Sequence, residues 1–170
     1  MGDFVLQIKE LLESVEALIA DPNKGLPEDI FLFVSRITPL INVDLLIKDD
    51  KNGTLLTWRD DGYCAAGWHI PGGIIRYKET MAARIEAVAK NELGTSVEFD
   101  PTPIAINEII HPSRNNRGHF ISLLIRCSLT TPPEEDLRFK GRNPMPDEWM
   151  WHKCCPDNII PVHEIYRKFI

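Results

Sequence analysis

The segment from residue 68 to residue 94 constrains the fold more than any other part of the chain. A short apolar run leads into a Pro-Gly-Gly sequence at 71–73, and a stretch without proline or glycine extends from Glu79 to Leu93. Two adjacent glycines let the backbone turn sharply and leave carbonyl oxygens that no side chain covers. Gly94 stands where a residue just past a helix end is expected. The pattern predicts a strand, a glycine turn and a helix in direct succession.

The rest of the chain predicts a single domain of mixed α/β or α+β class, which suits a length of 170 residues. Asn52-Gly53 is typical of a two-residue hairpin turn. Residues 131–147 hold four prolines and many charges, which predicts a loop. Residues 161–170 predict a short C-terminal helix. Apolar or alternating runs predict strands at 41–47, 54–59, 68–70, 103–110, 119–129 and 148–153.

Two helices are expected before the first strand. Apolar residues recur at helical spacing and predict an amphipathic helix that ends near Asp21-Pro22. A second helix is expected from about Pro27 to just before Pro39. We therefore divide the chain into an N-terminal helical extension, residues 1–37, and a main domain, residues 38–170. The apolar faces of the extension need a partner, and both the main domain and a second copy of the chain remain open.

Charge and composition exclude several classes of function. The net charge of −6 argues against nucleic-acid binding, because an acidic surface repels phosphate backbones. The sequence has no basic segment followed by an apolar run and no apolar stretch of membrane-spanning length, so we expect no membrane partner and a cytoplasmic location. None of the four cysteines forms a C-x-x-C pair, which favours reduced thiols over a zinc site or a disulfide framework.

The end of the predicted helix offers a metal ligand. Glu92 stands on its last turn, and if the glycine turn lies beside it, a carbonyl of Gly72 and the Glu92 carboxylate can share one divalent cation. Mg²⁺ suits such oxygen ligands and normally keeps waters and substrate phosphates as its other ligands. A bound Mg²⁺ would give this acidic protein a way to hold a diphosphate.

The same residues resemble the Nudix signature. That signature is a glycine, five residues, a glutamate, seven residues and then Arg-Glu-apolar-x-Glu-Glu-x-Gly. Its first glycine, first glutamate, last glutamate and last glycine match Gly73, Glu79, Glu92 and Gly94. Its arginine and its two other glutamates are replaced by Ala87, Val88 and Asn91.

Outside the signature, the chain is similar to one branch of this superfamily, the GDP-mannose mannosyl hydrolases. The similar segments are 38–45, 55–59 and 67–73, within a resemblance that covers roughly residues 28 to 155. This branch also loses most helix carboxylates and keeps the one in Glu-Leu-Gly, here Glu92. The resemblance implies the Nudix fold, an α/β/α sandwich around a mixed sheet, here with an N-terminal helical extension. It also implies a homodimeric, Mg²⁺-dependent hydrolase of a nucleotide sugar such as GDP-mannose or GDP-glucose.

The resemblance further implies a role for each matching residue. Glu92 and a carbonyl of Gly72 would bind Mg²⁺. Arg59 would lie near the diphosphate and stabilise the leaving group, and Asp44 matches an acidic residue near the sugar. His111 would reach the diphosphate or the sugar. In this branch, water attacks the anomeric carbon of the sugar, and GDP and free sugar are released while the metal neutralises the departing diphosphate.

Two other residues complete the expected substrate-binding set. Arg76 lies close to the position after the glycine pair, where the family has an arginine and this chain has Ile74. His119 is the second. The branch carries its general base, a histidine, on the loop before the last strand, but residues 141–148 contain no histidine. The base therefore remains open among His111, His119, Asp147 and Glu148.

Alternatives remain open at this point. Asp44 is also compatible with a solvent-facing strand position, and Arg59 with a surface cation. The cationic turn at 114–117 suits either phosphate binding or solubility of a hairpin. A pyrophosphohydrolase that attacks phosphorus and a binding module that has lost catalysis are the alternative functions. The carboxylates missing at Val88 and Asn91 argue against the former, and Glu92 argues against the latter.

Overall fold

The structure, a computed structural model, describes residues 2–170, and side chains are discussed from residue 5 onward; Met1, the first residue of the expected extension, lies outside the described part. No helix within residues 2–170 combines the length and the apolar character needed to cross a bilayer. In chain order the elements are α1 (Gly2–Glu16), η1 (Pro22–Lys24), α2 (Glu28–Ile37), β1 (Leu40–Asp49), β2 (Gly53–Arg59), β3 (Gly67–His69), β4 (Gly72–Ile74), α3 (Met81–Leu93), β5 (Val97–Phe99), β6 (Ala105–Ile110), β7 (His119–Leu129), η2 (Glu135–Leu137), β8 (Trp149–His152) and η3 (Pro161–Tyr166).

A mixed eight-stranded sheet forms the centre of the molecule. Its main path runs β3-β2-β1-β7-β5, while β4 pairs with β1, β6 with β7 and β8 with β2. β1 and β7 are parallel, from Leu40 opposite Phe120 to Ile47 opposite Cys127, and the other strand pairs are antiparallel. β1 is buried from Val43 to Ile47, as expected for a strand that is covered on both faces. Because β4 pairs with β1, the glycine turn lies directly beside this central strand.

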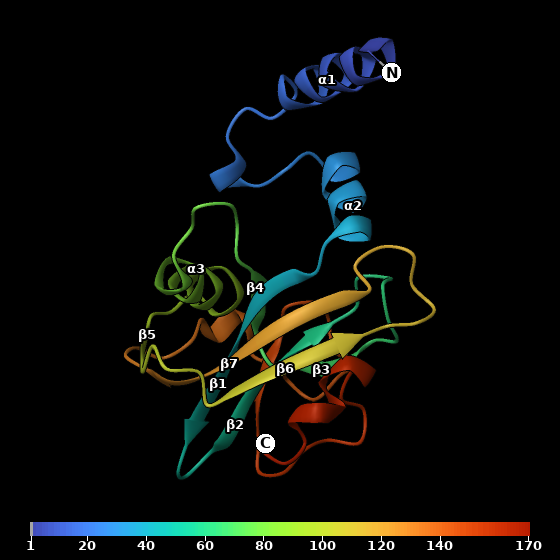
Figure 1. The fold of residues 1–170 in the computed structure, drawn as a ribbon. Helices are drawn as coiled ribbons and strands as arrows, with labels where there is room; N and C mark the ends of the chain where they lie inside the picture. The colour runs from blue at the N-terminus through green and yellow to red at the C-terminus, as the bar shows by residue number, and fades with distance from the viewer. Residues whose placement is uncertain (1) are drawn as a thin grey trace.

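Helical segments cover both faces of this sheet (Figure 1). Leu45 of β1 belongs to the apolar core that includes Ile85 and Leu93 of α3. Its neighbour Leu46 belongs to a second core, which includes Tyr166 of η3. Successive side chains of a strand point to opposite faces, so the two cores lie on opposite sides of the sheet. The α/β/α arrangement with a mixed sheet that the sequence predicts is confirmed.

Three helices differ from the sequence-based expectation in their ends or in their type. The first helix ends at Glu16, five residues before the expected end, and a short 3-10 helix follows at Pro22–Lys24. α3 begins after Thr80, whose hydroxyl accepts a hydrogen bond from the Ala83 N–H at 3.1 Å and caps the helix. The expected C-terminal helix is a 3-10 helix that ends at Tyr166.

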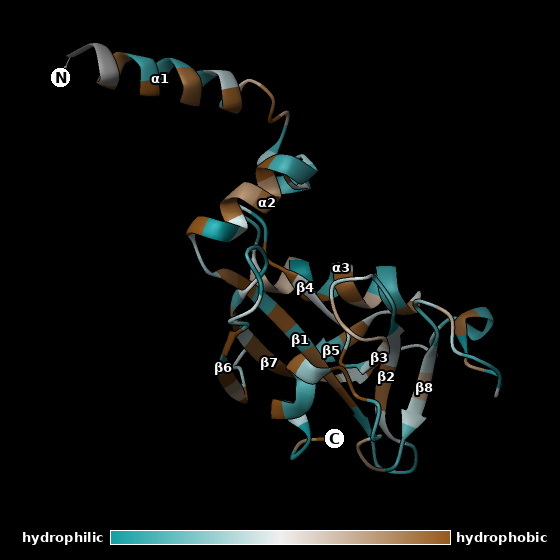
Figure 2. Ribbon diagram, turned by 90° about the vertical axis from the view of Figure 1, so that its right-hand side faces the viewer, coloured by the Kyte–Doolittle hydropathy of each residue, from teal (hydrophilic) through white to brown (hydrophobic). Residues whose placement is uncertain are grey.

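The two helices of the extension differ in their contacts. α2 lies against the main domain, with Ser35 buried. α1 projects away from the rest of the chain, and Figures 1 and 2 show its apolar residues without a covering element. The exposed apolar side chains of α1 are Val5, Leu6, Ile8, Leu11, Leu12 and Val15. Of the two partners that the sequence left open for the extension, the main domain therefore covers α2, and it does not cover α1.

Candidate active site

The glycine turn lies tightly between β1 and α3. Gly72 is opposite Asp44 of β1 in the strand pairing. A Cβ atom on Gly72 would lie 2.8 Å from the Val43 carbonyl oxygen, and one on Gly73 would lie 2.8 Å from Cγ2 of Val88 in α3. Both positions therefore exclude a side chain. This close packing brings the Gly72 N–H within 3.3 Å of Oε1 of Glu92, so the turn and the helix end meet as the sequence predicts.

Glu92 lies among groups that do not neutralise it. Its Oε2 is 3.4 Å from the Thr57 hydroxyl. Burial, together with the negative charges of Asp147 and Asp44, raises the pKa of Glu92 to about 8, against the lowering effect of the hydrogen bonds from the Gly72 N–H and the Thr57 hydroxyl. Three carboxylates thus act on one region, and the bonds to Gly72 and Thr57 bring no cation to it. Such a region fits a divalent cation.

The side chains alone do not complete a metal site. Within residues 2–170, no three histidine, cysteine, aspartate or glutamate side chains are grouped so that they could hold an ion. Further ligands would have to be backbone carbonyls such as that of Gly72, waters or substrate phosphates, and this is the ligand set that Mg²⁺ prefers. The residues present therefore fit Mg²⁺ bound together with a phosphorylated substrate.

Asp44 is held in a buried hydrogen-bond network. Its side chain accepts hydrogen bonds from the hydroxyls of Ser122 and Tyr166 and from Nδ2 of Asn42, the last at 3.0 Å. Burial raises its pKa to about 6, while these donors and the positive charge of Arg59 oppose that rise. Asp44 therefore does not face solvent. Donors engage both of its oxygens, an arrangement that suits a residue which orients a ligand.

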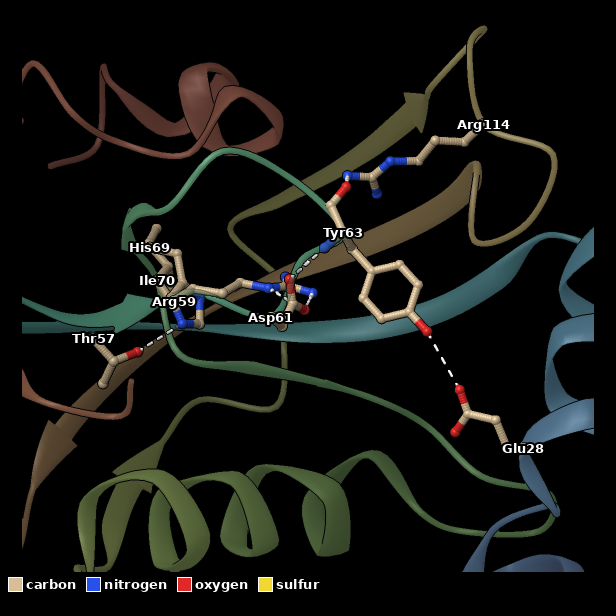
Figure 3. Close-up of polar contacts among 8 residues, drawn as sticks. All are labelled: Glu28, Thr57, Arg59, Asp61, Tyr63, His69, Ile70 and Arg114. Carbon is tan, nitrogen blue, oxygen red and sulfur yellow. Dashed lines mark hydrogen bonds and ion pairs between the residues drawn. The ribbon is translucent and has the colours of Figure 1, made fainter. Parts of the chain in front are cut away.

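Asp44, Gly72 and Glu92 line one cavity of about 450 Å³. Arg59, at the end of β2, donates from Nε to Oδ2 of Asp61 at 2.8 Å. Its positive charge also lowers the pKa values of Asp44 and His69, so it lies within electrostatic reach of the cavity floor. Figure 3 shows Arg59 and Asp61 between Thr57 and Tyr63. The cavity therefore has carboxylates near Glu92 and an arginine beside them.

Two histidines form part of the cavity wall as neutral rings. Nδ1 of His69 is 2.9 Å from the Ile70 carbonyl oxygen, which can only accept, so this nitrogen carries the hydrogen. Nε2 of His69 is then the acceptor side of the ring and lies 2.9 Å from the Thr57 hydroxyl, which can give its one hydrogen either to this nitrogen or to Oε2 of Glu92. Nδ1 of His163 accepts from the Ile70 N–H at 3.1 Å. Burial lowers the pKa of His163 to about 3 and that of His69 well below its usual value, which keeps both rings uncharged.

The structure separates the residues singled out from the sequence into two groups. Those that line the cavity are Asp44, Arg59, Gly72 and Glu92. Those outside its lining are Arg76, His111 and His119. Arg76 borders a separate apolar groove beside α2, and His119 pairs with Glu108 at 3.2 Å on the exposed sheet edge. The His111 N–H donates to the Gly118 carbonyl at 2.7 Å and closes the β6–β7 hairpin.

The loop before β8 separates two of the candidates for the general base. Asp147 lines the cavity, is exposed, and has a positive φ of 69°. Glu148 is buried and accepts from Arg142 at 2.5 Å and from the Met145 N–H at 2.9 Å, and these contacts lower its pKa. Asp147 is therefore free to meet a water in the cavity, whereas Glu148 fastens its own loop.

Sequence reasoning missed three contributions. His163 and Tyr166 reach the site from the C-terminal segment, and no local pattern marks them, because their contacts join residues about 90 to 120 positions apart. Arg114 and Arg117 line the cavity, although the sequence left their turn open between phosphate binding and solubility. Arg84 forms a bidentate pair with Glu79, Nε–Oε2 2.9 Å and Nη2–Oε1 2.8 Å.

Comparison with known proteins agrees on the fold. No family model matches the sequence. The chain is 32% identical over 79 residues to the low-salt glycan biosynthesis protein Agl8 of Haloferax volcanii, a match that covers 46% of this chain and about half, 50%, of that protein.

Solved structures of similar shape are Nudix proteins and enzymes of nucleotide hydrolysis. A MutT Nudix hydrolase from Burkholderia pseudomallei has a TM-score of 0.58 at 19% identity and covers 77% of this chain and 97% of its own. A UDP-X diphosphatase has a TM-score of 0.55 at 15% identity and covers 98% of this chain and 90% of its own. These likenesses show that the chain has the Nudix fold.

Proposed function

We propose that the chain is a Mg²⁺-dependent hydrolase of a nucleoside diphosphate sugar, of the GDP-mannose or GDP-glucose type. The observation that carries this proposal is the meeting of the Gly72 turn with Glu92 at a cavity that Arg59 also lines. The Glu92 carboxylate, whose hydrogen-bond partners carry no positive charge, suits a divalent cation, and the arginine suits the diphosphate that this cation would share.

Each residue in the cavity has a distinct part in this proposal. Glu92 and the Gly72 carbonyl would hold Mg²⁺, which when bound neutralises the departing diphosphate. Arg59 binds a diphosphate oxygen and compensates the charge that develops on the leaving group. Asp44, fixed by Ser122 and two other donors, orients the sugar.

We assign the general base to Asp147. It lines the cavity, close enough to Glu92 that its charge raises the pKa of that group. Its left-handed backbone conformation is uncommon outside glycine and is typical of residues held for a function. In this role the Asp147 carboxylate takes a proton from the attacking water as the bond from the anomeric carbon to the phosphate oxygen breaks.

Attack on the sugar carbon is favoured over attack on phosphorus. α3 contributes a single carboxylate, Glu92, to the cavity lining, and Val88 is buried in the apolar core. Similarity to a glycan biosynthesis protein supports a sugar-containing substrate. The fold likeness to a UDP-X diphosphatase supports the second candidate, a pyrophosphohydrolase of another nucleoside diphosphate derivative.

Product analysis in ¹⁸O-labelled water tests the two routes directly. The protein is incubated with GDP-mannose and Mg²⁺, and products are separated and weighed by mass spectrometry. We expect GDP and mannose, with the label in mannose. GMP and mannose phosphate with labelled phosphate would support the second candidate. Binding without turnover over a panel of nucleotide sugars would replace both with a binding module. The Glu92→Gln variant is the control for metal-dependent turnover.

We also propose a homodimer that forms through α1, in a protein that acts in the cytoplasm. The exposed apolar stripe of this helix, Ile8 to Val15, is the support for the dimer. Removing such a stripe from water is favourable, and a second copy carries the same stripe.

A further inference from the structure

The hairpin between β6 and β7 brings an arginine with an unsatisfied donor to the cavity. Arg117 lines the cavity, and its Nε is buried and has no hydrogen-bond partner among the described residues. Its guanidinium carbon lies 4.1 Å from the centre of the Tyr63 ring. A buried donor without an acceptor is costly, and so this group calls for an acceptor that the protein itself does not provide.

The N-terminal helix α2 fixes this arginine in place. The backbone N–H of Arg117 donates to Oγ of Ser35 at 3.0 Å. Arg117 itself has a left-handed backbone conformation, with a φ of 49°. The ring of Phe31 lies 5.9 Å from the guanidinium carbon. On the other side of the stack, the Tyr63 hydroxyl donates to Oε1 of Glu28 at 3.3 Å (Figure 3). Helix α2 therefore contacts both members of the Tyr63–Arg117 stack.

A second arginine steadies the same loop from the hairpin. Arg114 donates from its guanidinium to the Tyr63 carbonyl oxygen, and the Tyr63 N–H donates to Oδ1 of Asp61 at 3.1 Å. The loop that carries Tyr63 is thus tied to the hairpin and to the Arg59–Asp61 pair. Arg117 keeps a preset position because its neighbours are themselves fixed, and this lowers the entropy lost when it binds a ligand.

The position of Arg117 along the cavity sets which group it meets. The Thr57 hydroxyl of β2 contacts Glu92, and Arg59, two residues further along this strand, donates to Asp61. Asp61 in turn accepts from the backbone N–H of Tyr63, on whose ring Arg117 stacks, so Arg59 lies between the Glu92 end of the cavity and Arg117. A ligand whose sugar lies beside Asp147 and Asp44 extends past Arg59 before it meets Arg117.

We propose that Arg117, stacked on Tyr63, binds the phosphate on the nucleoside side of the substrate, and that α2 positions this pair through Ser35. The inference rests on the proposed function for the direction of the substrate. The guanidinium, which lines the cavity, offers its N–H groups to a phosphate oxygen in a charge-assisted hydrogen bond. The N-terminal extension thereby becomes part of substrate recognition.

Titration calorimetry without divalent metal tests the subsite apart from turnover. The probes are GMP, which carries the nucleoside-side phosphate, and mannose 1-phosphate, which carries the sugar-side phosphate. We expect Arg117→Gln to raise the Kd for GMP by about tenfold or more and to change that for mannose 1-phosphate little. The matched control is Arg126→Gln, which removes the same charge from an exposed position of β7 outside the cavity lining.

The outcomes separate this inference from the proposed function. Equal Kd values for GMP in Arg117→Gln and Arg126→Gln would overturn it, as would a wild-type protein that binds no GMP. Weaker binding of mannose 1-phosphate in place of GMP would also overturn it, because the arginine would then serve the sugar-side phosphate. Loss of GMP affinity in a protein that turns over no nucleotide sugar would uphold the subsite while the proposed hydrolase fails.

The part of α2 is tested at Ser35. Ser35→Ala removes the acceptor of the Arg117 backbone N–H, and we expect weaker GMP binding with a small fall in the melting temperature and no loss of the folded state. Ser35→Thr keeps a hydroxyl and is expected to restore the affinity. A general loss of structure would instead abolish the cooperative melting transition and would weaken the binding of mannose 1-phosphate as much as that of GMP. Unchanged GMP affinity in Ser35→Ala would remove α2 from the subsite.

Discussion

Asp147 and Glu148 are neighbours in sequence with opposite environments. The first is exposed to the cavity, and the second is buried with Arg142 and the Met145 N–H. A carboxylate that is saturated with donors holds its charge firmly and accepts a proton poorly. The one that faces the cavity keeps its lone pairs for water, and this difference decides which of the two can act as a base.

Replacement of Asp147 tests that assignment. Asp147→Asn removes the proton acceptor while keeping the shape, and we expect kcat for the nucleotide sugar to fall by about 10²- to 10⁴-fold. KM should change little, because the diphosphate contacts remain. Steady-state kinetics measures both values. Asp136→Asn, at an exposed position of η2, is the matched control. A fall in kcat below threefold would assign the base elsewhere.

The buried His152 of β8 makes the free energy of unfolding depend on pH in the acid range. Its ring packs edge-on against Trp68 at 4.8 Å, and burial lowers its pKa to about 4. In the unfolded chain the His152 ring binds a proton near pH 6.5, whereas in the folded chain it stays neutral until about pH 4. The free energy of unfolding therefore falls as the pH falls from about 6.5 to 4. We expect this residue to cost up to about 3 kcal/mol at the acid end.

Urea unfolding at pH 7 and at pH 4.5 measures this effect. The His152→Gln variant carries no titrating group at this position, so its free energy of unfolding should fall less between the two pH values than that of the wild type. His69 and His163 contribute to acid instability in both proteins and cancel in the comparison. The same pH dependence in both proteins would show that His152 is protonated in the folded state.

At the scale of elements, a buried ion pair fastens the loop after the glycine turn to α3. Glu79 and Arg84 meet through two hydrogen bonds, and their side chains are only 14% and 9% exposed. Glu79 also accepts from the Arg76 N–H at 2.9 Å, and the bonds to both residues lower its pKa. The pair therefore sets where the loop leaves β4 and where the helix begins.

Breaking this pair should destabilise the fold. Arg84→Met leaves the Glu79 carboxylate buried without its cation, which is expected to cost about 3 kcal/mol in the free energy of unfolding. The double variant Arg84→Met/Glu79→Leu should cost less, because no charge is left behind. Arg138→Met, which breaks an exposed pair with Glu135, should cost below about 0.5 kcal/mol. Chemical denaturation gives all three values.

Local elements were predicted from the sequence better than the contacts between them. The strand, glycine turn and helix at 68–94 follow one another, so propensity and spacing suffice to predict them. The parallel pairing of β1 with β7 joins residues about 80 positions apart, and no local pattern marks it. The same holds for Asp44, whose partners Ser122 and Tyr166 come from distant elements. The sequence could bring Gly72 and Glu92 together because they lie in one continuous segment, before and at the end of a single helix.

At the scale of the whole molecule, the described side chains of α1 form an apolar face that no other described element covers. Its exposed apolar residues include Leu11, which is 66% exposed, and Val15, which is 38% exposed. Monomeric proteins rarely leave such a stripe in water. The homodimer expected from the sequence would cover it, whereas α2 already has its place against the main domain.

Light scattering after size exclusion tests this assembly. We expect a dimer for the wild type at micromolar concentration and a monomer for Leu11→Glu/Val15→Glu, because two buried charges oppose association. Glu10→Gln, on the polar side of the same helix, should leave the dimer intact. A monomeric wild type, or a double variant that remains a dimer, would contradict the assignment of α1 as the interface.

The pairing of Arg84 in α3 with Glu79 has a consequence for sequence patterns that expect an arginine at position 87. Positions 84 and 87 lie three residues apart and so share one side of the helix, which lets a guanidinium at either height serve the same region. A signature with fixed spacing counts Ala87 as a mismatch at its arginine position and does not consider Arg84. A search pattern that accepts an arginine at either position 84 or position 87, together with a glutamate at 79, would retrieve similar sequences that a pattern with fixed spacing rejects.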